Sequence, residues 1–161
     1  MAQVEPSCKQ TPGPPFGAYW AADRKLRLAL GCPSDELRSG FMAEQTFERG
    51  LMVWREADRT ILVLYDDGVW RSVPDRWQDG MPERSCGATA PSGLLQPKRG
   101  FGLVWCTEPG VKEGLGWAVG EEQGRTNEWQ TFDQGQMMFL QGRSAIYALF
   151  TEGTFQQYPL R

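Results

Sequence analysis

The 161-residue chain contains no histidine, and this absence excludes much enzyme chemistry. Nucleophiles that depend on a Ser–His or Cys–His pair cannot be built here, and neither can a zinc site of mixed Cys and His ligands. The formal net charge is only -3, and the 17 basic residues are scattered along the chain. A balance of this kind does not attract nucleic acid by charge alone. We therefore expect no nucleic-acid partner and no cofactor.

Long apolar runs are also missing. The longest apolar strings, such as 61–65, have the length of a strand, so we expect no membrane insertion by this chain. Residues 1–15 lack the basic and apolar regions of a signal peptide and hold four prolines among polar residues, which predicts a Pro-rich lead-in that ends an extended linker. Our hypothesis is a fragment of a longer secreted or membrane-anchored protein, located outside the cell or in the cell envelope.

Cysteine is scarce, with four residues and no Cys-x-x-Cys pair for a metal or redox site. Two disulfides in an oxidising compartment are the favoured interpretation, and four free thiols in a cytosolic protein are the alternative. Cys8 precedes the first half of the chain much as Cys86 precedes the second. This suggests a Cys8–Cys86 bond, with Cys32–Cys106 as the remaining pair, although sequence alone does not fix the connectivity.

Glycine and aromatic residues are abundant, and they are arranged in a repeat. Sliding the chain along itself until Phe16 meets Phe101 superposes 16–74, called repeat 1, on the corresponding part of 101–161, called repeat 2, with 75–100 as the linker. A register kept without a gap over a whole module indicates a duplication, and we expect the two copies to form one compact unit. Identical pairs include Phe16 and Phe101, Trp20 and Trp105, Gln45 and Gln130, Gly50 and Gly135, Met52 and Met137, and Ile61 and Ile146.

Each repeat predicts a short helix followed by four strands. The helix ends at Gly31 or Gly116, and short apolar strings separated by turn residues follow as a meander. The expected fold class is mainly β with short helices. Because two separate meanders would expose their edges, we expect them to pack with pseudo-twofold symmetry, like propeller blades or as a sandwich or barrel.

The phrases Leu30-Gly31-Cys32-Pro33, Phe47-Glu48-Arg49-Gly50 and Ile61 to Gly68 carry a family likeness. In this pattern the module resembles the LGFP repeat of actinobacterial envelope and secreted proteins. It is more similar still to LGCP, FERG and LYDDG-W modules of secreted proteins from Chloroflexi-like bacteria. The resemblance implies a propeller-like, non-catalytic module that associates with the cell wall.

Carboxylates are the remaining candidates for catalysis. The repeat offers Glu36 with Glu121, and Glu48 with Asp133, and a glycosidase needs two carboxyl groups facing each other. A structural role in the loop and the hairpin turn is the simpler interpretation. The Asp66-Asp67-Gly68 phrase is typical of a hairpin turn and does not indicate a calcium loop. We therefore expect no enzyme.

Aromatic residues that occur in only one repeat are the candidates for binding. Trp20 with Trp105, Trp54 with Phe139, and Trp70 with Phe155 recur, so we expect them in the core. The candidate ligand-binding residues are Trp117, Trp129, Arg125, Trp77 and Phe41. Flat rings beside polar groups suit sugar stacking or a protein contact. Filling an asymmetric interface between the repeats is the structural alternative.

Two functions follow from these observations. The leading hypothesis is a non-catalytic extracellular or cell-envelope module that binds a glycan or a cell-wall polymer. The alternative is a structural or protein-interaction domain of a membrane-anchored or surface-assembly protein, with another envelope protein as partner.

Overall fold

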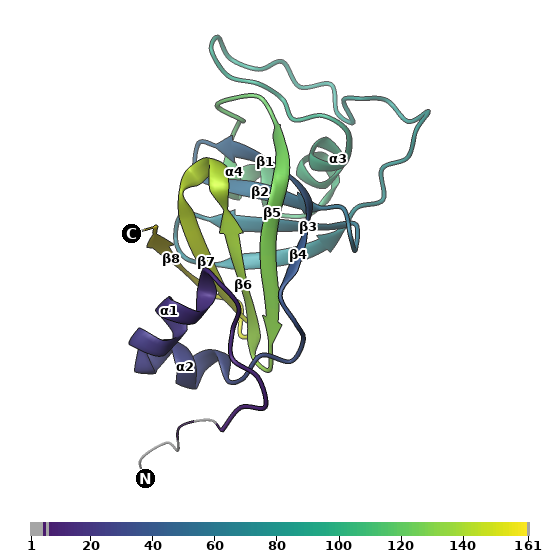
Figure 1. Ribbon diagram of the computed structural model, residues 1–161. Coiled ribbons are helices and arrows are strands. Elements are labelled where there is room, and N and C mark those ends of the chain that lie inside the picture. The colour runs from purple at the N-terminus through teal and green to yellow at the C-terminus, as the bar shows by residue number, and fades with distance from the viewer. Residues whose placement is uncertain (1–4, 6, 161) are drawn as a thin grey trace. The chain divides into compact units, whose positions relative to one another are not determined.

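The computed structural model describes residues 5 and 7–160 (Figure 1). Residues 1–4 and 6 of the expected lead-in, and Arg161, lie outside the described residues. The fold is mainly β, with antiparallel strands and short helices, which confirms the predicted fold class. The chain forms two compact units: unit 1 contains Met1–Ser39 and Asn127–Arg161, and unit 2 contains Gly40–Thr126.

Unit 2 holds the strands of repeat 1. These are β1 (Arg38–Phe47, its first two residues in unit 1), β2 (Gly50–Arg55), β3 (Thr60–Tyr65) and β4 (Trp70–Pro74). Each strand pairs antiparallel with the next, so the four form a meander. The β1–β2 turn is short, and Phe47 faces Gly50 across the ladder.

Unit 1 holds the strands of repeat 2. They are β5 (Gln123–Phe132, its first four residues in unit 2), β6 (Gly135–Leu140), β7 (Ala145–Phe150) and β8 (Phe155–Pro159), with the 3₁₀ turn η1 (Gln141–Arg143) before β7. They also form an antiparallel meander. Every strand begins and ends at the repeat counterparts of the first and last residues of its equivalent in repeat 1.

Each repeat has two short helices where the sequence predicted one. Repeat 1 has α1 (Phe16–Ala22) and α2 (Arg24–Leu30), and repeat 2 has α3 (Arg99–Thr107) and α4 (Val111–Leu115). Asp23 causes the first break because its backbone is extended and its carboxylate accepts from the Leu26 N–H at 3.2 Å, which caps α2. Both pairs end, as predicted, at a glycine with positive φ, Gly31 (+75°) and Gly116 (+74°).

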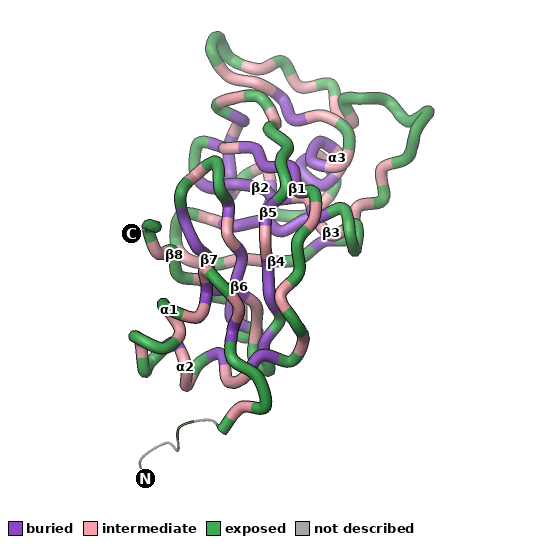
Figure 2. The backbone as a smooth tube through the Cα atoms, viewed as in Figure 1, coloured by how far each residue is buried: buried purple, intermediate pink, exposed green. Residues whose placement is uncertain are grey.

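The helices pack on the strands of the other repeat. In unit 1, α1 and α2 lie beside β6–β8 (Figure 1), and Phe16 and Leu30 are buried with Met137 and Ile146. In unit 2 the equivalent residues form the reverse combination, and the buried set contains Phe101, Trp105 and Leu115 from the helices with Phe47, Met52 and Ile61 from the strands. Burial therefore follows the strands and the inner faces of the helices in both units (Figure 2). Each hydrophobic core needs both repeats.

Paired contacts fix the helix ends and join them to hairpins. The Trp20 Nε1–H donates to the Gly31 carbonyl at 3.1 Å in unit 1, and Trp105 donates to Gly116 at 2.7 Å in unit 2. The last residue of each helix pair then binds a hairpin of the other repeat: the Leu30 carbonyl accepts from the Gln134 N–H at 2.9 Å, and the Leu115 carbonyl accepts from the Arg49 N–H at 2.9 Å. The Leu-Gly phrase thus serves the fold.

Both predicted disulfide pairs are wrong. Cys8 bonds Cys32 and Cys86 bonds Cys106, with Cα–Cα distances of 5.4 Å and 5.8 Å. Each bond lies within one unit and ties the segment before a repeat to that repeat's own helical region. The prediction failed because it matched cysteines by analogous position, whereas the bonds join residues only 24 and 20 apart in sequence. Two disulfides are typical of an oxidising compartment.

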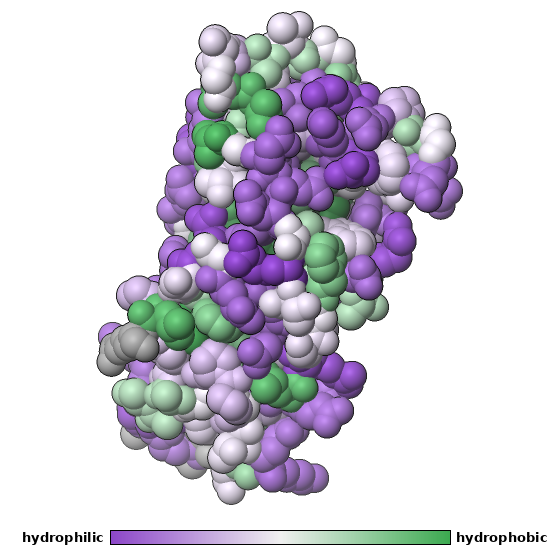
Figure 3. Space-filling model, turned by 45° about the horizontal axis from the view of Figure 1, so that its top comes forward, coloured by the Kyte–Doolittle hydropathy of each residue, from purple (hydrophilic) through white to green (hydrophobic). Residues whose placement is uncertain are grey.

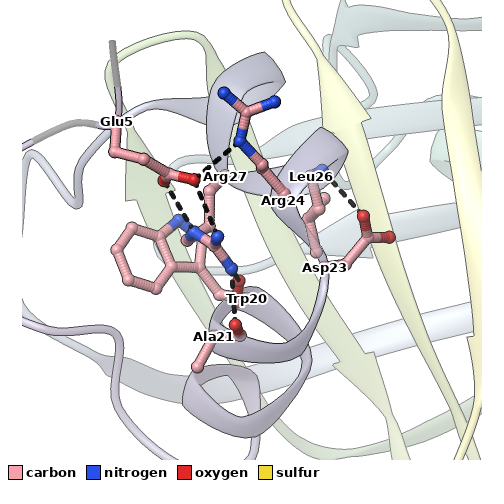
Figure 4. Close-up of polar contacts among 7 residues, drawn as sticks. All are labelled: Glu5, Trp20, Ala21, Asp23, Arg24, Leu26 and Arg27. Carbon is pink, nitrogen blue, oxygen red and sulfur yellow. Dashed lines mark hydrogen bonds and ion pairs between the residues drawn. The ribbon is translucent and has the colours of Figure 1, made fainter.

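Ion pairs add a second tie to the start of the chain. Figure 4 shows the Glu5 carboxylate between Arg24 and Arg27 of α2, at 3.0 Å and 2.9 Å. Arg27 also donates to the backbone carbonyls of α1 at Trp20 and Ala21. The hydrogen bonds with Arg27 lower the pKa of Glu5. This arrangement joins Glu5 to α2, although exposed ion pairs add little stability.

None of the described helices is long and apolar enough to cross a membrane. The face of the molecule in Figure 3 is largely hydrophilic, and its hydrophobic residues lie in separate small patches.

Candidate functional site

Two adjoining hollows in unit 2 form one groove. The first has a volume of about 230 Å³ and the second about 260 Å³, and both are lined by Trp54, Arg99 and Glu122. We call them hollow A and hollow B, and together the groove. The sheet contributes one wall, and the linker and the start of α3 contribute another. Further lining residues are Phe41, Gln45, Arg84, Lys98 and Glu121 in hollow A, and Arg59, Asp75, Trp77 and Asp79 in hollow B.

Aromatic rings line both hollows. In hollow A, Phe41 of β1 meets Trp54 of β2 edge to face, with 6.1 Å between ring centroids. A side chain at Gly124 would come within 2.3 Å of the Phe41 ring, so glycine is needed for the ring to lie there. In hollow B, Trp77 is held by its indole N–H, which donates to the Pro82 carbonyl at 3.1 Å.

Two buried polar atoms beside the rings make no hydrogen bond with the described residues: the Gln45 Oε1 and the Trp54 Nε1. The Gln45 amide is fixed because its Nε2 donates to the Gly120 carbonyl at 3.0 Å. Since the side chain is only 4% exposed, its free oxygen cannot turn to bulk solvent. A buried polar atom without a partner is costly, and such exceptions point to strain, to a bound water or ion, or to a ligand.

Unit 1 lacks this arrangement at the equivalent place. Gln130 is the repeat counterpart of Gln45, and its Nε2 donates to the Asp35 carbonyl at 3.0 Å in the same way. Its Oε1, however, accepts from the Gly13 N–H at 2.8 Å. Phe139 stands where unit 2 has Trp54, so no indole N–H is present. Gly13 of the lead-in therefore fills the glutamine acceptor in unit 1, whereas the equivalent acceptor in unit 2 stays unfilled by the described residues.

Charged groups surround the groove. Arg99 lies at the start of α3 with a left-handed backbone (φ +52°), and its guanidinium is 3.6 Å from Glu122 and 3.7 Å from Glu83. Burial raises the pKa of Glu122, and the Arg99 and Lys98 charges oppose that rise. In hollow B, Arg59 lies 3.8 Å from Asp75. The groove therefore combines aromatic walls with cations and carboxylates.

The predicted binding residues are divided by the structure. Phe41, which is 41% exposed, and Trp77 line the groove. Trp117 packs on Trp105 with 5.1 Å between ring centroids and contacts the core of unit 2. Trp129 is buried in β5 within unit 1, and Arg125 is exposed. The structure thus places neither Trp117 nor Trp129 in the groove.

Sequence reasoning missed Trp54, Gln45 and Glu122 as groove residues. Trp54 does pack against the core, as expected, but it also lines both hollows. The available signal was chemical: Trp54 faces Phe139 in the repeat alignment, and Glu122 faces Leu37. Comparing polarity at shared positions, in addition to aromatic character, would have selected both residues.

One of the two carboxylate pairs, Glu48 with Asp133, has structural contacts. The Glu48 Oε1 accepts from the Trp117 N–H at 2.8 Å in unit 2, and the Asp133 Oδ2 accepts from the Cys32 N–H at 3.3 Å in unit 1. These carboxylates therefore anchor the chain beyond the helices to the hairpin turn. The members of each pair, including Glu36 and Glu121, belong to different units.

Comparison with known proteins gives no match to this chain from protein-family models, curated proteins or solved structures. The likeness to LGFP-type repeats thus stays a prediction.

Proposed function

We propose that this chain is a non-catalytic module of the cell envelope or extracellular space that binds a glycan or cell-wall polymer in the groove of unit 2. The supporting observation is that Gln45 and Trp54, which both line hollow A, each carry a buried polar atom without a hydrogen-bond partner among the described residues, Oε1 and Nε1 respectively. One atom accepts and the other donates. A sugar hydroxyl both donates and accepts, so a saccharide can pair with both atoms at one place.

The aromatic walls support the same ligand class. Phe41 and Trp54 in hollow A and Trp77 in hollow B provide apolar ring surface beside polar groups. A sugar ring has C–H faces and a hydroxyl rim, so it matches such surroundings. Two hollows that share lining residues suit a chain of sugars better than a single small molecule. The two disulfides are consistent with an extracellular location.

One feature favours the alternative of a protein-interaction domain. Unit 1 has a larger hollow, about 740 Å³, beside α1, lined by Ala18, Tyr19, Tyr158 and the exposed Leu160. Apolar and tyrosine surface of this kind is common in protein interfaces. The proposal for the groove is preferred because unpaired polar atoms specify a polar ligand.

The test measures binding of soluble glycans and peptidoglycan fragments by tryptophan fluorescence and by calorimetry. It compares the unmodified chain with the Trp54→Phe variant. This change removes the indole N–H and installs the residue that unit 1 has at the equivalent place. Loss of one hydrogen bond should weaken binding by about tenfold. Trp70→Phe is the matched control, because Phe155 is its counterpart and it does not line the groove. Equal binding by both variants, or no binding by the unmodified chain, would overturn the proposal.

A further inference from the structure

Resting on the proposed function, we infer that the saccharide is acidic, and that its carboxylate binds in hollow A between Arg84 and Lys98. Both side chains line this hollow. Arg84 lies in the linker, and Lys98 is the residue just before α3. Within residues 5 and 7–160, neither side chain makes an ion pair within 4.0 Å. Two like charges beside one small hollow repel each other, and a bound anion removes that repulsion.

Among the described residues, the neighbouring acidic groups form no ion pair within 4.0 Å with Arg84 or Lys98. Glu122 and Glu83 are both within 4.0 Å of Arg99. Burial raises the pKa of Glu122, which reflects the cost of keeping its charge in this hollow. Glu121 is exposed at the rim and forms no ion pair with Arg84 or Lys98 among the described residues. It is available to accept from sugar hydroxyls, which carboxylates do well.

Lys98 also marks the difference between the two units. It precedes repeat 2 at the same distance as Gly13 precedes repeat 1, and Gly13 is the residue whose N–H fills the Gln130 acceptor in unit 1. In unit 2 the same position carries a cation beside the unfilled Gln45 acceptor. The place that is sealed in one unit is therefore open and positively charged in the other.

The charge distribution also fixes the direction of the ligand. Hollow A has three cations, Arg84, Lys98 and Arg99, against Glu121 and Glu122. Hollow B has Arg59 and Arg99 against Asp75, Asp79 and Glu122, so carboxylates are in excess there. An acidic sugar is favoured in hollow A and disfavoured in hollow B, where a neutral sugar fits.

The experiment compares matched probes that differ in one charged group. Calorimetry with the full chain measures binding of a galacturonate oligomer and its methyl ester, and of the N-acetylglucosamine–N-acetylmuramic acid disaccharide and chitobiose. At least one acidic probe should bind about tenfold more tightly than its neutral match, and added salt should reduce the difference. Arg84→Gln and Lys98→Gln should each reduce it as well. Arg76→Gln, an equal charge change in the same linker but outside the groove, should not.

The outcomes separate the two proposals. Equal binding of acidic and neutral probes, lost in Trp54→Phe, would overturn the acidic specificity and keep the glycan site. A preference for acid that survives both Arg84→Gln and Lys98→Gln would also overturn this inference. Both proposals would be overturned if the full chain bound none of the four probes and no glycan in the wider panel.

Discussion

Gln45 and Gln130 occupy equivalent positions in β1 and β5, and they differ in a single hydrogen bond. Both donate through Nε2 to a loop carbonyl, but only Gln130 has its oxygen filled, by the Gly13 N–H. The chain thus contains its own reference for the groove: a closed version in unit 1 and an open version in unit 2.

This difference predicts unequal costs of truncation. Gln130→Ala removes two hydrogen bonds and leaves the Gly13 N–H unpaired, whereas Gln45→Ala removes one hydrogen bond and one unpaired oxygen. We expect Gln130→Ala to lower the free energy of unfolding by about 1 kcal/mol more than Gln45→Ala. Denaturant unfolding of the two variants measures this. Equal losses would mean that Gln45 has a partner that unit 2 does not show.

The disulfide pairing predicts damage confined to one unit. Replacing Cys8 and Cys32 by serine opens a loop closed across 24 residues, which should cost about 3 kcal/mol. Faster amide exchange is expected in 7–39 and 127–160, while 40–126 is unchanged. Hydrogen-exchange mass spectrometry maps this, and replacement of Cys86 and Cys106 should produce the reverse pattern. If exchange rose equally in both units after either change, the assignment of one disulfide and one hydrophobic core to each unit would be contradicted.

Gly50 should not tolerate any side chain. Its φ is +156°, and a Cβ there would lie 2.2 Å from the Leu64 carbonyl oxygen. Since backbone cannot move aside easily, Gly50→Ala should destabilise unit 2 by about 2–3 kcal/mol. Gly120→Ala is the control, because a Cβ at Gly120 meets nothing within 4 Å, and its unfolding midpoint should be almost unchanged. A small effect of Gly50→Ala would show that the β2–β3 ladder can shift.

Tyr158 predicts a loss of stability in alkaline solution. Burial raises the pKa of Tyr158 to about 12, and the Asp23 carboxylate adds to the effect. Because the folded pKa is above the unfolded value of about 10, the stabilisation from the protonated hydroxyl is complete below pH 10 and is lost as the pH rises to about 12. Unfolding at about pH 9 and pH 11 should show a smaller loss in Tyr158→Phe. An equal loss would remove Tyr158 as the cause.

Much of the fold could be predicted from local pattern. Alternating apolar residues and turn glycines specify the four strands of each repeat, and Gly31 and Gly116 specify where the helices end. The exchange of helices between repeats could not be predicted. Phe16 and Phe101, like Leu30 and Leu115, are identical, so either helix pair fits either meander by composition. Which helix pair packs on which meander depends on tertiary contacts, and a periodic sequence pattern does not specify these.

The site was predicted less well, for a related reason. Selecting aromatics without an aromatic counterpart did include Phe41 and Trp77, which line the groove. It passed over Trp54 because a phenyl and an indole ring were counted as equivalent, although only the indole carries an N–H. Trp117 and Trp129 met the same criterion but pack against other side chains or lie buried. Burial depends on tertiary contacts, which residue type alone does not determine.

The exchanged helices also limit how such a chain can change its length over evolution. If one repeat were deleted, the remaining helices would keep their apolar faces and the remaining strands would keep theirs, but the residues that cover them would be gone. Phe16 and Leu30 would lose Met137 and Ile146 together. A chain of this architecture shortened to one repeat would therefore need its helices to fold back onto their own strands, or a second polypeptide to supply the missing half.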